Sequence, residues 1–243
     1  MNILVLNVNT TVAVTDEIVH AARRAAGAGT TVTGLTPRFG APSVEGYVES
    51  YLAAGAVLET VRGYRGSYDG IVLAGFGEHG VEGLRELVEV PVVDITEAAA
   101  MVASLLGRSF SVVTTLDRAV PLIEDRLTLM GLRGRCVSVR ASGLAVLEVE
   151  ADPETARQVI VAEALRAVRE DRAEVICLGC GAMAGLTEAV EAATGVPVVD
   201  GVTAAVKLVE SLHQLGLRTS KIRTYARPLP KDVVWPGAAE VPA

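Results

Sequence analysis

Short aliphatic runs alternate along the chain with longer segments in which apolar residues recur every three or four positions. The short runs predict β-strands at residues 2–6, 30–35, 71–74, 109–113, 135–139, 174–178 and 196–199. The longer segments predict helices at residues 15–26, 44–62, 152–171 and about 203–215, and another that ends near residue 130. Runs that are apolar at every position are typical of parallel strands buried on both faces, so the pattern indicates an α/β fold with mostly parallel sheets.

The chain contains an internal repeat. Residues 90–106 match residues 196–212 at eight of seventeen positions, residues 69–75 lie over 174–180, and residues 6–11 lie over 110–115. Three segments that share nearly one offset indicate the duplication of an α/β unit. We therefore expect two similar Rossmann-like domains related by a pseudo-two-fold axis, with the active site in the cleft between them. The first domain is predicted to comprise residues 1–97 and about 205–243, and the second residues 98–204.

Composition is typical of a globular protein that acts on small molecules. Half of the 243 residues are hydrophobic, 21% are charged, and the net charge is −7 with a pI near 5.1. The lack of a Lys/Arg cluster or an aromatic stripe disfavours nucleic acid and anionic membranes as partners. No apolar run reaches the ~18 residues that span a membrane, and the N-terminus lacks the features of a signal peptide. With three cysteines and no disulfide pattern, we expect a soluble cytoplasmic protein.

The strongest candidate for a functional site lies within residues 174–186. An aliphatic run there ends in Gly179-Cys180-Gly181, and a helical pattern follows. Open α/β sheets bind their ligands at the C-terminal ends of the strands, and a helix N-terminus favours a thiolate or a bound carboxylate. The flanking glycines let a backbone or a ligand approach closely, which distinguishes Cys180 from an inert buried cysteine.

Other common catalytic motifs are absent from the sequence. There is no Gly-x-x-x-x-Gly-Lys-Ser/Thr phosphate loop and no Gly-x-Ser-x-Gly nucleophile elbow. Residues 75–80 fit Gly-x-Gly-x-x-Gly, but the dinucleotide fingerprint belongs on the first βαβ unit of a fold, so NAD is not expected. The three histidines, His20, His79 and His213, are far apart and have no metal-ligand spacing. We expect neither a metal nor an organic cofactor.

The chemistry that remains is acid–base catalysis around one thiol. A thiol whose pKa is lowered toward neutrality can take a proton from a carbon next to a carbonyl, or return one to it. The carbanion that forms needs fixed hydrogen-bond donors. The candidate donors are Asn9, Thr10, Thr114, Thr115 and the backbone amides of Gly181 and Ala182.

Several short motifs, spread over essentially the whole chain, are found together in one known family. They lie at residues 7–11, 44–46, 75–80, 91–99, 111–115, 178–183, 195–200 and 219–221. In these motifs the chain resembles the Asp/Glu/hydantoin racemase family, closest to its hydantoin and allantoin racemase branch. The resemblance implies a homo-oligomeric racemase without a cofactor, in which two cysteines face each other across the cleft and exchange a proton with the substrate carbon. Cys180 matches the second of these cysteines.

The chain departs from the family pattern at the first cysteine. The usual sequence there is Ala-Cys-Phe-Gly-Asp-Pro-Gly, whereas this chain has Ala74-Gly75-Phe76-Gly77-Glu78-His79-Gly80. Gly75 stands where the first thiol is expected, and it is also the residue that the repeat pairs with Cys180. Gly75, Phe76 and Gly77 are expected to contact the substrate.

Three interpretations of Gly75 stay open. In the first, His79 or Glu78 replaces the missing thiol, and the protein is a racemase or epimerase. In the second, a lone thiol suffices, as in the similar arylmalonate decarboxylases, where loss of CO₂ makes the carbanion. In the third, the protein only binds a small carboxylate or ureide, or it carries out another one-thiol reaction such as elimination or ring opening. A thiol that forms a covalent adduct, as in the similar maleate isomerases, belongs to this third group. We expect proton transfer at the α-carbon of a small carboxylate or ureide, with Cys180 as acid or base.

Overall fold

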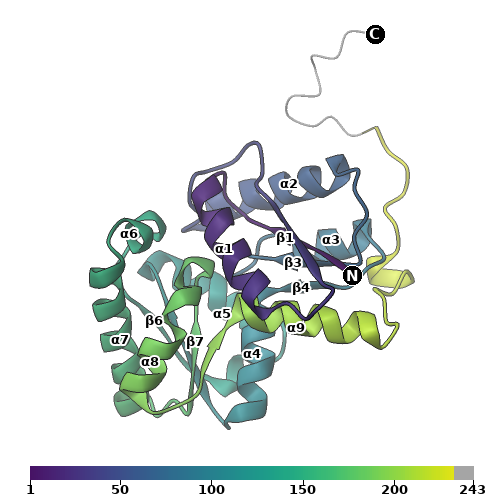
Figure 1. Ribbon diagram of the computed structural model, residues 1–243. Coiled ribbons are helices and arrows are strands. Elements are labelled where there is room, and N and C mark those ends of the chain that lie inside the picture. Colours follow the sequence, from purple (N-terminus) through teal and green to yellow (C-terminus); the bar gives the residue numbers. More distant parts are fainter. Residues whose placement is uncertain (233–243) are drawn as a thin grey trace.

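The structure is a computed structural model in which residues 1–232 are described, and this part of the chain forms two four-stranded parallel sheets (Figure 1). The strand orders are β2-β1-β3-β4 and β6-β5-β7-β8. The strands are β1 (Asn2–Leu6), β2 (Thr31–Leu35), β3 (Gly70–Leu73), β4 (Val92–Asp94), β5 (Phe110–Thr114), β6 (Cys136–Ala141), β7 (Val175–Leu178) and β8 (Val198–Asp200). Strands that match in the repeat occupy equivalent places in the two sheets, so the predicted α/β fold with two similar parallel sheets is confirmed.

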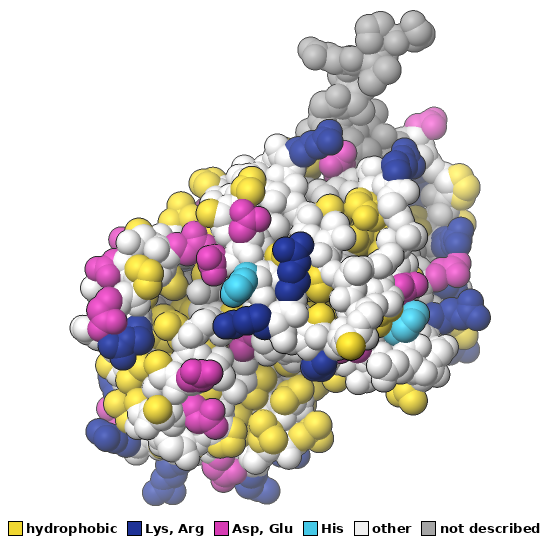
Figure 2. Space-filling model, in the orientation of Figure 1, with side chains coloured by type: hydrophobic (Ala, Val, Ile, Leu, Met, Phe, Trp, Pro, Cys, Tyr) yellow, Lys and Arg dark blue, Asp and Glu magenta, His cyan; other side chains and the backbone are white. Residues whose placement is uncertain are grey.

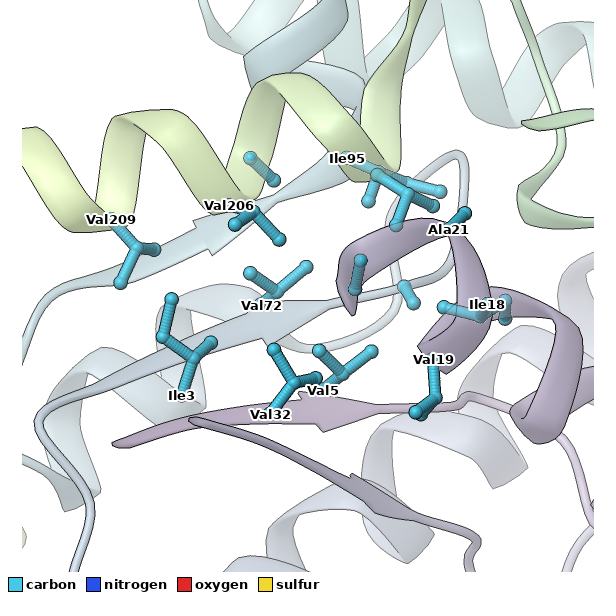
Figure 3. Close-up of a cluster of buried hydrophobic side chains, with 14 of the residues drawn as sticks. Ile3, Val5, Ile18, Val19, Ala21, Val32, Val72, Ile95, Val206 and Val209 are labelled. Carbon is cyan, nitrogen blue, oxygen red and sulfur yellow. The ribbon is translucent and has the colours of Figure 1, made fainter. Parts of the chain in front are cut away.

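Helices cover both faces of the first sheet. They are α1 (Val12–Ala25), α2 (Tyr47–Gly63), α3 (Val81–Leu87) and α9 (Gly201–Gln214). Successive side chains of a strand point to opposite faces, so Ile3 packs toward α1 and α9 while Leu4 packs toward α2 and α3. Figure 3 shows the cluster on the first of these faces, where Val72 of the sheet lies between Ile18 of α1 and Val206 of α9. Burial of each such side chain stabilises the fold by about 1.5–3 kcal/mol.

The second sheet is covered in the same way. Its helices are α4 (Ile95–Leu106), α5 (Val120–Leu129), α7 (Pro153–Glu170) and α8 (Thr187–Thr194). On β5, Val112 belongs to the cluster that includes α4 and α5, and its neighbour Val113 belongs to the cluster that includes α7 and α8. Strands covered on both faces have few polar positions, which explains the aliphatic runs in the sequence.

Two helices cross from one half of the molecule to the other. Helix α4 starts directly after β4 of the first sheet but packs against β7 and β8, and α9 starts directly after β8 of the second sheet but packs against β3 and β4. The two crossings touch, because a β-carbon on Gly201 would lie 2.4 Å from the carbonyl oxygen of Ile95. The division into domains of residues 1–97 with about 205–243, and 98–204, stays a prediction, and its residues 233–243 lie outside the described part of the chain.

Two short helices, α3 and α6, were not predicted. Helix α6 (Val146–Ala151) is six residues long and is followed at once by Asp152, which caps α7 by accepting a hydrogen bond from the N–H of Thr155 at 3.1 Å. So short a segment shows too little periodicity to be recognised.

The surface in Figure 2 carries basic and acidic side chains that are mixed, with no continuous basic patch on that face. No helix within residues 1–232 is long and apolar enough to cross a membrane.

Candidate active site

A cavity lies between the two sheets at the C-terminal ends of β1, β3, β5 and β7. Parallel strands of both sheets end there, and this is the edge at which open α/β sheets bind their ligands. Nine of the eleven predicted site residues line it, namely Asn9, Gly75, Phe76, His79, Thr114, Thr115, Cys180, Gly181 and Ala182.

The other two predicted residues, Thr10 and Gly77, do not line the cavity. The N–H of Thr10 donates to the carbonyl of Ala41 at 3.0 Å, which anchors the loop after β1. Gly77 has a φ of 127°, a conformation that favours glycine, and its N–H donates to the hydroxyl of Thr96 at 2.8 Å. Both residues therefore hold loops in place next to the cavity, and their contact with a substrate stays a prediction.

Cys180 follows β7 by two residues and precedes a short 3₁₀ helix, Gly181–Leu186. Its carbonyl accepts a hydrogen bond from the N–H of Met183 at 3.0 Å, which fixes the turn. The preceding residue, Gly179, is held by the hydroxyl of Thr114, which donates to its carbonyl at 3.1 Å. The hydroxyl of Thr114 thus joins the ends of β5 and β7 and orients the segment that carries the thiol.

The Cys180 sulfur is protonated at neutral pH. Burial is the main cause that raises the pKa of the thiol, which is about 11. The N–H of Ala182 lowers this pKa, and the carboxylates of Glu150 and Glu45 raise it. The lowered thiol pKa that a strand-to-helix junction suggests is therefore not found, because burial outweighs the hydrogen bond from Ala182.

The imidazole of His79 fills the space beside Gly75. A β-carbon on Gly75 would lie 2.4 Å from Cδ2 of His79 and 2.6 Å from Cγ1 of Val8. Any side chain at position 75 therefore needs the imidazole to move. The position where the family resemblance implies a thiol is occupied by the histidine ring instead.

His79 is a neutral, fixed histidine. Its side chain is buried, with 4% of the residue exposed, and burial lowers its pKa to about 4. Nδ1 lies 3.0 Å from the hydroxyl of Ser50, and Nε2 lies 3.3 Å from the carbonyl of Phe76. A neutral imidazole keeps one nitrogen as a base at physiological pH.

Glu78, the other candidate replacement for the first thiol, is engaged elsewhere. One of its oxygens accepts from the N–H of Gly80 at 3.0 Å and the other pairs with Arg126 at 3.0 Å. Arg126 is 1% exposed and also contacts Asp94, Glu97 and Glu82 at 2.8, 2.6 and 2.6 Å. Glu78 thus belongs to a buried ion cluster, and it does not line the cavity.

Two buried side chains offer donors to the cavity. Oδ1 of Asn9 accepts from Nδ2 of Asn7 and from the N–H of Thr11, both at 2.9 Å. Nδ2 of Asn9 has no partner among residues 1–232, nor does the hydroxyl of Thr115. Because the lining contains no Lys or Arg among these residues, the donors of the site are neutral.

Segments from both halves cover the cavity. Val44 of the first half and Val146 of the second line it, and the N–H of Val146 donates to Oε1 of Glu45 at 3.0 Å. The volume of the cavity is about 40 Å³.

Some residues that build the site were not identified from the sequence. Asn7, Val8 and Val146 line the cavity, and Ser50 contacts His79 from helix α2. Asn7 lies in the same polar run as Asn9, so the run itself was a usable signal. Ser50 and Val146 lie in helical segments remote from the strand ends, and nothing in the sequence indicates that they approach the site.

No group of three or more His, Cys, Asp or Glu side chains within residues 1–232 is arranged to hold a metal ion. Two similar parallel sheets define a two-domain α/β protein, and a thiol and an imidazole line the cavity between its halves. The Asp/Glu/hydantoin racemase family matches residues 3–209, and the chain belongs to this family.

Individual relatives share nearly the full length of the chain. A hydantoin racemase of Pseudomonas sp. (strain NS671) is 41% identical, with 99% of this chain and 96% of the relative covered. The crystal structure of an allantoin racemase from Pseudomonas fluorescens is 64% identical, has a TM-score of 0.95, and covers 97% of this chain and 100% of its own. An arylmalonate decarboxylase structure, 20% identical with a TM-score of 0.58 over 87% of this chain and 92% of its own, shares the fold. The hydantoin racemase and the allantoin racemase show that this chain is an isomerase of the racemase type.

Proposed function

We propose that this protein transfers protons at the α-carbon of a small ureide or carboxylate, as a cofactor-independent racemase of the hydantoin type. The observation that carries the proposal is that the thiol of Cys180 and the imidazole of His79 line one cavity, from equivalent loops of the two halves. Racemisation needs a base on one face of the carbon and an acid on the other. Cys180 serves one face and His79 the other.

The resting protonation states give each group a role. The pKa of His79, near 4, leaves its imidazole neutral and able to accept a proton, and the pKa of Cys180, near 11, keeps its thiol able to donate one. In the forward step His79 takes the α-proton and Cys180 delivers its own proton to the opposite face. The imidazolium that results then gives up its proton and the thiolate takes one up, which restores the resting state, or the pair carries out the reverse step.

Fixed donors stabilise the carbanion between these steps. Its charge spreads onto the neighbouring carbonyl oxygen, which needs hydrogen bonds in the transition state. Nδ2 of Asn9 and the hydroxyl of Thr115 line the cavity without partners among residues 1–232, and they are the donors that we assign to this oxygen.

The lining favours a neutral ureide ring over a carboxylate. No Lys or Arg among the described residues lines the cavity, and the charges that raise the pKa of Cys180 are the carboxylates of Glu150 and Glu45. An anionic substrate would meet these negative charges without a cation to pair with. The racemases named for hydantoin and allantoin among the relatives support the same class.

A one-thiol decarboxylase of the arylmalonate kind is the second function that the sequence raised. That mechanism uses the space at position 75 for a departing carboxylate, and here the imidazole of His79 fills this space. The likeness to the decarboxylase is one of fold, whereas the racemase relatives are 41% and 64% identical. A protein that only binds its ligand is the third alternative, and it predicts that Cys180→Ser leaves every measurable function intact.

Proton NMR in D₂O tests the proposal. Single-enantiomer allantoin and 5-substituted hydantoins, L-aspartate, L-glutamate and an arylmalonate are incubated with the protein, with Cys180→Ser and with Cys136→Ala, a control at a buried thiol outside the cavity. We expect deuterium at the α-carbon of a ureide together with loss of optical rotation, both reduced about 100-fold or more in Cys180→Ser. Exchange with retained configuration or CO₂ release from the malonate would favour the one-thiol reaction, and no exchange with any substrate would overturn the proposal.

The assembly and the location of the protein belong to the same proposal. The resemblance to this family leads us to expect a cytoplasmic homo-oligomer. Helix α2 carries several exposed apolar side chains, including Tyr51 and Val48, which suit a surface covered by another copy. Light scattering coupled to gel filtration tests the oligomer, and a monomer mass would contradict it.

A further inference from the structure

The imidazole of His79 is held at both nitrogens by groups of the first half. Nδ1 lies 3.0 Å from the hydroxyl of Ser50 on helix α2, and Nε2 lies 3.3 Å from the carbonyl of Phe76. Ser50 is 2% exposed, so water does not compete for its hydroxyl. The same hydroxyl also makes a short contact with the carbonyl of Glu78. One hydroxyl therefore connects the ring to the backbone of its own loop.

The hydrogen atoms at this junction can be arranged in two ways. The Ser50 hydroxyl has one hydrogen, and the Glu78 carbonyl can only accept it. When Ser50 donates to Glu78, Nδ1 of His79 carries the ring hydrogen and donates to Ser50, so Nε2 is a bare base and the Phe76 carbonyl has no donor from the ring. When Ser50 donates to Nδ1 instead, Nε2 carries the hydrogen and donates to Phe76, and the Glu78 carbonyl loses its donor. The first arrangement is the one in which Nε2 can accept a proton.

The protonated ring also fits this junction. An imidazolium has two N–H donors, and each has an acceptor in place, namely the Ser50 oxygen and the Phe76 carbonyl. The Ser50 hydrogen then stays on the Glu78 carbonyl. A proton taken up at Nε2 therefore leaves every donor of the ring hydrogen-bonded, which reduces the cost of a buried charge.

We propose that Ser50 is a positioning residue that keeps the ring hydrogen of His79 on Nδ1 and so leaves Nε2 as the base for the substrate proton. This inference rests on the proposed function, in which His79 takes that proton. Whether one nitrogen of a histidine carries a hydrogen is commonly decided by the hydrogen bond that the other nitrogen makes.

The charged groups around His79 pair with one another. Arg126 lowers the pKa of His79 through its charge, while Glu78 next to the ring pairs with that same Arg126 at 3.0 Å. Across the cavity the other titratable group is Cys180. Replacing Ser50 leaves Arg126, Glu78 and Cys180 in place. Its effect on the ¹⁵N signals and on kcat therefore reports on His79.

The test removes the hydroxyl of Ser50 and follows the position of the His79 ring hydrogen by NMR. In Ser50→Ala the Nδ1 hydrogen loses its acceptor, and the carbonyl of Phe76 remains the single acceptor for the ring. We expect the ¹⁵N signals of His79 to change from the Nδ1–H to the Nε2–H form, with assignment aided by the presence of three histidines in the chain. Thr60→Ala is the matched control, because Thr60 lies on the same helix and donates to the carbonyl of Ala56.

Activity supplies the second reading. We expect kcat for a ureide substrate to fall about 10-fold or more in Ser50→Ala, with KM changed less than about 2-fold, because proton transfer and not binding is affected. Ser50→Thr, which keeps a hydroxyl, restores kcat, and Thr60→Ala leaves kcat and the His79 signals as in the wild type. His79 signals that stay unchanged in Ser50→Ala, or an unchanged kcat, would overturn the inference. If the wild type exchanges no substrate while the signals still change, the proposed function fails and the control of the ring hydrogen by Ser50 stands.

Discussion

Cδ2 of His79 lies 2.4 Å from the position that a β-carbon on Gly75 would occupy. Real β-carbons do not approach another atom so closely, so a side chain at position 75 and this placement of the imidazole exclude each other. The two residues should therefore be regarded as one unit, in which the glycine makes room for the ring. The lack of a thiol at position 75 is matched by the gain of a titratable group at position 79.

The first prediction tests this steric coupling. Gly75→Cys places a thiol against His79 and Val8, and we expect the free energy of unfolding to fall by about 1–3 kcal/mol, as for other overpacked cores. Combined with His79→Ala, which removes the ring, the same substitution should cost much less, giving a coupling energy of about 1 kcal/mol or more. Urea denaturation measures both. Gly55→Ala, at a helix position with open space around it, is the control, and strictly additive effects at positions 75 and 79 would contradict the coupling.

The second prediction concerns the reactivity of Cys180. Because burial raises its pKa to about 11, the fraction of thiolate is small at neutral pH. We expect the rate of alkylation by iodoacetamide, followed by mass spectrometry of the peptide, to rise about tenfold per pH unit from pH 7 to pH 10 without a plateau. Cys136 and Cys177 are buried and serve as internal references. A plateau below pH 9 would show a lowered pKa and would reverse the donor role assigned to this thiol.

The third prediction links His79 to stability. Its pKa is about 4 in the folded protein and 6.5 in the unfolded chain, so the unfolded state binds a proton first as the pH falls. The stabilisation is fully present above pH 6.5 and is lost between pH 6.5 and pH 4, by up to about 3 kcal/mol. His79→Gln lacks this titration and should lose less stability over that range, whereas His213→Gln, at an exposed position, should follow the wild type. Parallel pH profiles for His79→Gln and the wild type would refute the assignment.

The fourth prediction concerns Arg126, which comes from α5 of the second half and pairs with carboxylates of β4, α4, α3 and the loop that holds His79. Arg126→Met leaves Asp94 buried without its cation, and we expect a loss of about 3–5 kcal/mol in the free energy of unfolding. Arg157→Met removes an exposed ion pair with Glu154 and should cost less than about 1 kcal/mol. Urea denaturation compares them, and equal losses would show that the cluster does not hold the halves together.

The sequence was sufficient for the fold because its signals are local or repeated. Continuous aliphatic runs indicate buried parallel strands, and the repeat pairs the loop at Gly75 with the loop at Cys180 before any coordinates are known. Residues that directly follow strands, such as Asn9 and Thr115, could be assigned to one edge of the sheets for the same reason.

The parts that could not be predicted depend on packing between distant segments. Whether Gly75 leaves a void or receives a side chain is decided by the direction of the His79 ring, which in turn depends on a hydroxyl of α2. The pKa of Cys180 depends on how deeply the packing of distant segments buries the sulfur. Neither fact is expressed in a sequence period or a motif.

The exchange of α4 and α9 between the halves means that the molecule cannot be divided into two self-sufficient pieces. A fragment that ends at Gly107 carries α4, whose apolar side belongs to the second sheet, and it lacks α9, which covers the first. The fragment that starts at Arg108 carries α9, which covers the first sheet, and lacks α4, which covers the second. Each piece thus holds the part that the other is missing, and we expect the two to assemble by complementation when mixed, while either one alone exposes an uncovered sheet.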